Sequence, residues 1–121
     1  MSDPNLIVLY VDDPAASAQF YRELLDRDPL EVFPTYVAFS LGGGFTLGLW
    51  ATKRVQPPPP TSGNRTELAF MVESEAAVHA LHRQWCERGV TIELAPHQEV
   101  FGLNFVALDP DGHRIRVCLF G

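Results

Sequence analysis

The chain has 121 residues, of which 46% are hydrophobic and 20% charged, an ordinary composition for one folded domain that argues against disorder. A net charge of −6, with only nine lysine and arginine residues scattered along the chain, argues against nucleic acid or an anionic membrane as a partner. No apolar run approaches the roughly 20 residues of a membrane span and no secretory signal is evident, so we expect a cytoplasmic protein. Cys86 and Cys118 could form one disulfide, although two free thiols are favoured in that compartment.

The first half of the chain predicts a strand, a helix and three further strands. The apolar run at residues 6–11 suits a buried strand, and Asp13 followed by Pro14 suits the start of a helix that ends near residue 26. Three more apolar stretches predict strands, the last two joined by a glycine-rich hairpin turn. These strands are expected at residues 30–33, 36–41 and 45–51.

A proline-rich segment then separates this half from a second half with the same order of elements. Four consecutive prolines at 57–60 fit neither a helix nor a central strand. The second half predicts a strand at 68–72, a helix at 73–88, and strands at 90–94, 101–108 and 113–120. We therefore predict a single domain over residues 1–121, with module 1 at about 5–52, a linker at about 53–65 and module 2 at about 66–121.

The two modules can be aligned as an internal repeat. An offset of 61 residues pairs the first strands and matches Leu6 with Glu67. Phe39 matches Val106 at an offset of 67, and one extra residue assigned to the second turn makes the offset 68 beyond it. In the last strands Gly48 then matches Arg116.

Each βαβββ module covers one face of its sheet with a helix and leaves the other face bare, so that face must be covered in another way. We expect the two bare faces to curve around a shared cavity. Alternation along the strands predicts that Tyr36 and Trp50 lie on the bare face of module 1. The same reasoning predicts that Phe101 and Phe105 line the bare face of module 2.

Two short motifs add to the repeat. Residues 109–112 read Asp-Pro-Asp-Gly before the final strand, and the first helix contains Ser17, Phe20 and Tyr21 as Ser-x-x-Phe-Tyr. With these features the chain resembles the vicinal oxygen chelate superfamily of glyoxalases, extradiol dioxygenases and bleomycin-resistance proteins. The resemblance implies an α+β fold of two tandem βαβββ modules whose paired mixed sheets form a curved cavity, and it implies a homodimer.

The resemblance also implies where a metal would be held, at one position in the first strand and one in the last strand of each module. These positions carry Leu6, Gly48, Glu67 and Arg116. Leucine and glycine offer no ligand atom, arginine is a cation that only donates hydrogen bonds, and an open catalytic site needs about three protein ligands. We therefore expect no metal and no other cofactor.

Glu67 and Arg116 form the most informative pair in the sequence. In this fold the first and last strands of a module are predicted to be antiparallel neighbours, which would bring both side chains together on one face. The pair could be a polar anchor for a ligand in an apolar pocket, or a salt bridge that neutralises two costly charges. Both interpretations stay open, and both can hold together.

The favoured interpretation is a metal-free protein that binds and sequesters a planar or partly apolar small molecule, in the manner of drug-resistance proteins, without catalytic residues. The residues predicted to bind the ligand are Tyr36, Trp50, Glu67, Phe101, Phe105 and Arg116. One alternative is a metal-independent lyase, isomerase or hydrolase, with Glu67 as general base and Arg116 stabilising an anion. Another is a degenerate domain with a structural or regulatory role.

Overall fold

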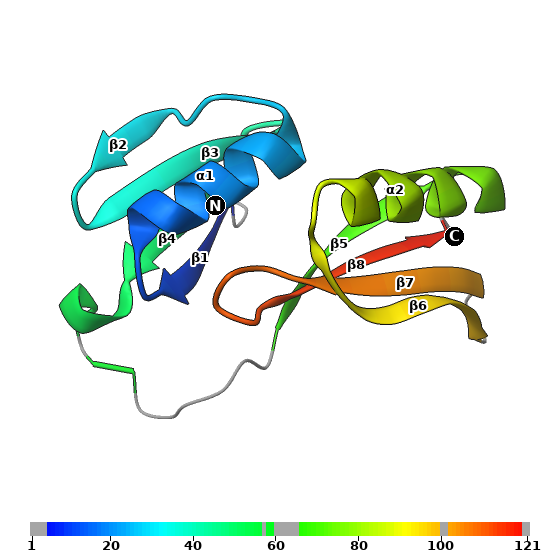
Figure 1. Cartoon of the computed structure of the whole chain (residues 1–121). Coiled ribbons are helices and arrows are strands. Elements are labelled where there is room, and N and C mark those ends of the chain that lie inside the picture. The colour runs from blue at the N-terminus through cyan, green and yellow to red at the C-terminus, as the bar shows by residue number, and fades with distance from the viewer. Residues whose placement is uncertain (1–4, 57, 60–65, 100–101, 120–121) are drawn as a thin grey trace. The chain divides into compact units, whose positions relative to one another are not determined.

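The computed structural model describes residues 5–56, 58–59, 66–99 and 102–119. The chain divides into two compact units, Met1–Ser62 and Gly63–Gly121, which are described one by one (Figure 1). Each unit is a four-stranded mixed sheet with one helix packed on it, in the order βαβββ. The predicted α+β class and the two βαβββ modules are therefore confirmed.

Unit 1 begins with strand β1 and helix α1. Asp13 caps α1, because its side chain accepts a hydrogen bond from the Ala15 N–H at 3.0 Å, and the helix ends where Asp26 adopts a left-handed φ of 52°. The sheet has the strand order β1-β4-β3-β2. The elements are β1 (Leu6–Val11), α1 (Pro14–Leu25), β2 (Glu31–Phe33), β3 (Tyr36–Gly42), β4 (Phe45–Ala51) and the 3-10 helix η1 (Thr52–Arg54).

Unit 2 repeats this arrangement with the strand order β5-β8-β7-β6. Its helix is capped by Ser74, whose hydroxyl accepts a hydrogen bond from the Ala77 N–H at 3.1 Å. The elements are β5 (Glu67–Val72), α2 (Glu75–Glu87), β6 (Thr91–Glu99), β7 (Gly102–Leu108) and β8 (Arg114–Leu119). In the described parts of the chain, neither α1 nor α2 is long and apolar enough to cross a membrane.

The prediction that the first and last strands of a module run antiparallel is wrong. They are neighbours as expected, but β1 is parallel to β4 and β5 is parallel to β8. The helix that follows the first strand carries the chain back to start the second strand in the same direction. Two antiparallel turns later, the last strand has that direction again, so it pairs with the first strand in parallel.

The core of each unit lies between the sheet and its own helix. In unit 1, Tyr21 of α1 is fully buried together with Phe39 and Leu49 of the sheet. In unit 2, Trp85 of α2 packs edge-to-face against Phe105, with the ring centroids 5.3 Å apart. In the part of each unit that the structure describes, no helix covers the other face of the sheet, and we call it the open face.

The Asp-Pro-Asp-Gly turn between β7 and β8 is held by its first residue. The Asp109 carboxylate accepts hydrogen bonds from the N–H groups of Asp111 at 2.9 Å and His113 at 2.8 Å. The Gly112 N–H donates to the Asp109 carbonyl at 3.0 Å, and Gly112 has a φ of 83°, which favours glycine. The motif therefore specifies a closed turn rather than a binding group.

The register of β7 differs by one residue from the predicted alignment. In unit 1, Val37 pairs with Leu49, and the equivalent pair in unit 2 is Phe105 with Val117, so the offset is already 68 in β7. The extra residue of module 2 therefore lies before β7 and not in the turn after it. A slip of one residue exchanges the two faces of a strand, and it changes the assignment of every side chain in β7.

Candidate functional site

An aromatic row crosses the open face of unit 1. Tyr10 of β1 is the register partner of Trp50 on β4, and Trp50 is also the partner of Tyr36 on β3. Directly opposed residues of neighbouring strands point to the same face, so these three side chains project from one face on adjacent strands. Tyr10 is 44% exposed, while Tyr36 and Trp50 are half-buried. Tyr36 also has a partner on β2, Phe33, which extends the aromatic strip to the edge of the sheet.

Gly48 allows one of these rings to lie close to the sheet. A Cβ atom at this position would be 2.5 Å from the Tyr36 hydroxyl oxygen and 2.8 Å from Cε1 of its ring. The ring therefore occupies the space where a side chain of residue 48 would stand. Beside Tyr36 is an open hollow of about 320 Å³, lined by Asn5, Leu6, Leu30, Glu31, Tyr36, Ala38 and Thr46.

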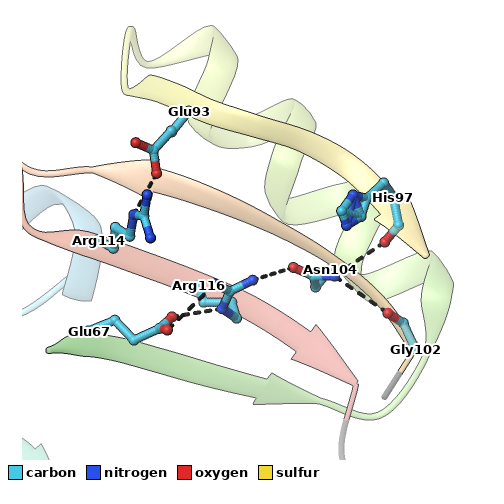
Figure 2. A network of polar contacts seen from close by, with 7 residues as sticks. All are labelled: Glu67, Glu93, His97, Gly102, Asn104, Arg114 and Arg116. Atoms are coloured by element: carbon cyan, nitrogen blue, oxygen red, sulfur yellow. Dashed lines mark hydrogen bonds and ion pairs between the residues drawn. The ribbon is translucent and has the colours of Figure 1, made fainter. Parts of the chain in front are cut away.

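An ion pair lies on the open face of unit 2. Glu67 pairs in register with Arg114, and Arg116 is two residues further along the same strand, so both side chains project from one face. Arg116 Nε donates to Glu67 Oε2 at 2.7 Å, and Nη2 makes a longer contact of 3.5 Å with Oε1 (Figure 2). The prediction that Glu67 and Arg116 lie together on one face is confirmed, although the strands that carry them are parallel and not antiparallel.

Asn104 is a third member of this cluster that the sequence analysis missed. It is fully buried on β7, and its side-chain oxygen accepts a hydrogen bond from Arg116 Nη1 at 2.6 Å. Its Nδ2 donates to the carbonyls of His97 at 3.3 Å and Gly102 at 3.5 Å, which leaves only the oxygen for Arg116 (Figure 2). A single amide within the apolar run at residues 103–107 was the signal, because a buried polar group needs partners.

A hollow of about 570 Å³ opens beside this cluster. We call it the arginine hollow, and its lining residues are Glu67, Ala69, Leu94, His97, Glu99 and Arg116. His97 Nε2 lies 3.4 Å from a carboxylate oxygen of Glu99. A second ion pair, Arg114 Nε to Glu93 Oε1 at 2.7 Å, holds β8 to β6 without lining the hollow (Figure 2).

The two aromatic residues predicted to bind a ligand in module 2 have different outcomes. Phe105 was expected on the open face, and this is wrong: it is fully buried on the helix side, where its ring contacts Trp85 and His82. The misplaced offset in β7 is the cause. Phe101 lies outside the described residues. Tyr36 and Trp50 of module 1 are on the open face, as the alternation predicted.

The positions where the family's enzymes would hold a metal do not fit a divalent cation here. Leu6 and Gly48 offer no ligand atom, and Arg116 directs a positive charge at Glu67, the one residue of the four that could coordinate. Within the described residues, no group of three or more histidine, cysteine, aspartate or glutamate side chains could hold a metal ion.

These features define the class of protein. The chain belongs to the Glyoxalase/Bleomycin resistance protein/Dioxygenase superfamily, whose family model matches residues 4–117. It is 32% identical to the phenazine antibiotic resistance protein EhpR of Enterobacter agglomerans, over 95% of this chain and 90% of EhpR. It is also 30% identical to the glutathione transferase FosA of Serratia marcescens, over 93% of this chain and 77% of FosA.

A solved structure supports the fold of the whole chain. The solution structure of protein ATC0852 from Agrobacterium tumefaciens is similar to it with a TM-score of 0.89 and 44% sequence identity. The similarity covers 100% of this chain and 99% of that protein. The fold inferred from the repeat and the turn motif therefore agrees with an experimental structure of a relative.

Proposed function

We propose that this chain is a resistance-type protein that binds a planar, largely apolar small molecule and sequesters it without chemical change. The observation that carries the proposal is the aromatic row of Tyr10, Trp50 and Tyr36 on the open face of unit 1. The similarity to a phenazine antibiotic resistance protein supports it, because phenazines are flat, fused aromatic molecules of the kind that such a row would accept.

The physical basis is stacking on a preformed apolar surface. An aromatic pair contributes about 0.5–1.5 kcal/mol beyond the burial of apolar area, so a fused ring system that contacts two or three rings gains several times this amount. The register of β1, β4 and β3 places the three side chains on one face before any ligand arrives, so the backbone needs no rearrangement on binding.

The proposal includes binding without a metal, since the four implied metal positions offer a single carboxylate that already pairs with Arg116. It also includes a cytoplasmic homodimer, which is common among proteins of this family. The enclosure of the ligand in one cavity formed by both modules stays a prediction.

Isothermal titration calorimetry of the full chain with phenazine tests the proposal. We expect the Trp50→Leu variant to bind phenazine about tenfold more weakly, the loss of roughly one aromatic contact. Val32→Ala is the control, because Val32 is an exposed apolar residue, 66% accessible, whose register partner Val37 is buried on the helix side of the same sheet. Equal affinity of the wild type and Trp50→Leu would contradict the role of the aromatic row.

The same samples distinguish binding from catalysis. We expect phenazine to be recovered unchanged after incubation with the protein, and its affinity to be the same with EDTA and with added Mn²⁺. A new product in the chromatogram would favour the alternative of a metal-independent enzyme that uses Glu67 and Arg116. Loss of binding in EDTA would refute the metal-free part of the proposal.

A further inference from the structure

The arginine hollow on unit 2 has a chemistry of its own, separate from the aromatic row. We infer that it binds an uncharged carbonyl group, such as a carboxamide, and that it discriminates against a carboxylate. The inference goes beyond the proposed function, because it rests on residues of unit 2 alone and would hold whether or not phenazine binds on unit 1.

Arg116 has more hydrogen-bond donors than its described contacts use. A guanidinium has five N–H groups. Within the described residues, Nε and Nη2 each direct one to Glu67, and Nη1 directs one to Asn104. One N–H on each terminal nitrogen is left, and Arg116 lines the hollow with its side chain 22% exposed. We assign these two N–H groups, which no described contact takes, as the donors that a ligand in the hollow would use.

The guanidinium of Arg116 is held by two neighbouring side chains. Glu67 holds one side of the guanidinium, and Asn104 holds Nη1 at 2.6 Å. Asn104 is itself fully buried and anchored to two backbone carbonyls, so its amide cannot turn to present a donor to Arg116 (Figure 2). A donor pair that is already ordered loses little entropy when a ligand binds.

The charges that line the arginine hollow disfavour an anionic ligand. Among the described residues, Arg116 is the one arginine that lines the hollow, and Glu67, Glu99 and His97 line it as well. Because Glu67 already neutralises the guanidinium, the described lining has no excess of positive charge from arginine, and an incoming carboxylate would meet two other carboxylates. A neutral carbonyl oxygen accepts from the N–H groups without this repulsion, while Ala69 and Leu94 supply apolar contact.

An amide fits better than a carbonyl alone. Each oxygen of Glu67 accepts from one N–H of Arg116, which leaves further lone pairs on the carboxylate, and the Glu99 carboxylate also borders the hollow. The N–H of a carboxamide can donate to such a carboxylate while its oxygen accepts from Arg116. The ligand class is therefore a neutral, flat or apolar molecule that carries an amide.

Nuclear magnetic resonance titration of the ¹⁵N-labelled full chain tests the inference with three probes: 2-naphthamide, 2-naphthoate and naphthalene. We expect 2-naphthamide to shift the Nε–H signal of Arg116 and to bind about tenfold more tightly than the other two, the worth of one hydrogen bond to a charged group. The indole N–H of Trp50 reports separately on the aromatic row.

Two variants, each of which replaces a glutamate that pairs with an arginine of β8, make the test specific. Glu67→Gln removes the neutralising charge, so we expect 2-naphthoate to gain about tenfold in affinity and to overtake 2-naphthamide. Glu93→Gln is the control, because Glu93 also pairs with an arginine of β8 at 2.7 Å and is equally exposed, 38% against 37%. We expect it to leave the preference for the amide unchanged.

Several outcomes would overturn the inference. They are a wild type that binds 2-naphthoate as tightly as 2-naphthamide, a preference that survives in Glu67→Gln, or no shift at Arg116 with any probe. Arg116→Gln provides an independent measurement, since it removes the donor pair and should abolish the difference between the three probes.

Discussion

The replacement of Phe105 by leucine tests whether this residue belongs to the core of unit 2 or to a ligand-binding surface. Phe105 is fully buried beneath α2, and its ring makes two edge-to-face contacts, with Trp85 at 5.3 Å and with His82 at 5.2 Å between centroids. If Phe105 lined a binding surface, its replacement would lower the affinity for the ligand and hardly change the free energy of unfolding. The structure predicts the opposite result.

The magnitude follows from these contacts. Each aromatic pair is worth about 0.5–1.5 kcal/mol, so the loss of two gives about 1–3 kcal/mol, and the smaller leucine adds part of the cost of a cavity. We expect Phe105→Leu to lower the free energy of unfolding by about 2–3 kcal/mol, a large share of the 5–15 kcal/mol of a typical domain.

Urea denaturation followed by circular dichroism measures this difference, and calorimetry with phenazine measures the affinity of the same variant. We expect the affinity to stay within about twofold of the wild type, since Phe105 faces away from the open face. Stability within about 0.5 kcal/mol of the wild type would refute the register of β7. A loss of affinity as large as that of Trp50→Leu would also refute it.

Two further changes test the other side of the sheet and the turn. Gly48→Ala should displace the Tyr36 ring and weaken phenazine binding several-fold, whereas the same change in a Tyr36→Ala background should have little effect. A double-mutant cycle measured by calorimetry tests this, and additive effects of the two substitutions would contradict the contact. Asp109→Ala removes the acceptor of two backbone N–H groups and should lower the free energy of unfolding, measured in urea, by about 2 kcal/mol. Asp111→Ala keeps the backbone N–H of residue 111, so it should lower the free energy of unfolding by less. Equal losses in the two variants would contradict this role of Asp109.

Much of the fold could be predicted because the apolar pattern repeats. The first and last strands of the modules aligned correctly, at offsets of 61 and 68, since Leu6 pairs with Thr46 as Glu67 pairs with Arg114. These alignments place Glu67 and Arg116 correctly on one face. The turn motif added the position of the last hairpin, because a glycine with positive φ and a capping aspartate have few other uses in this spacing.

The assignment of faces in β7 depended on the extra residue of module 2, whose position the apolar pattern does not mark. Residues 103–107 are almost uniformly apolar and buried, so they lack the alternation that would distinguish the two faces of β7. The extra residue could be placed before or after this strand with equal fit. That choice decided whether Phe105 or Asn104 pointed to the open face, and only the pairing with Val117 and Cys118 resolves it.

The parallel pairing of β5 with β8 bears on the order in which unit 2 forms. β7 and β8 are joined by a turn that closes through its own Asp109, and β6 and β7 are also consecutive, so these pairs involve short loops. β5 has to find a partner at the far end of the unit, and Glu67 and Arg116 are 49 residues apart. Closing a longer loop costs more entropy, so strand pairs that are far apart in the sequence form later during folding. We therefore expect the arginine hollow to be completed last during folding, when the final strand has left the ribosome and β5 docks beside it.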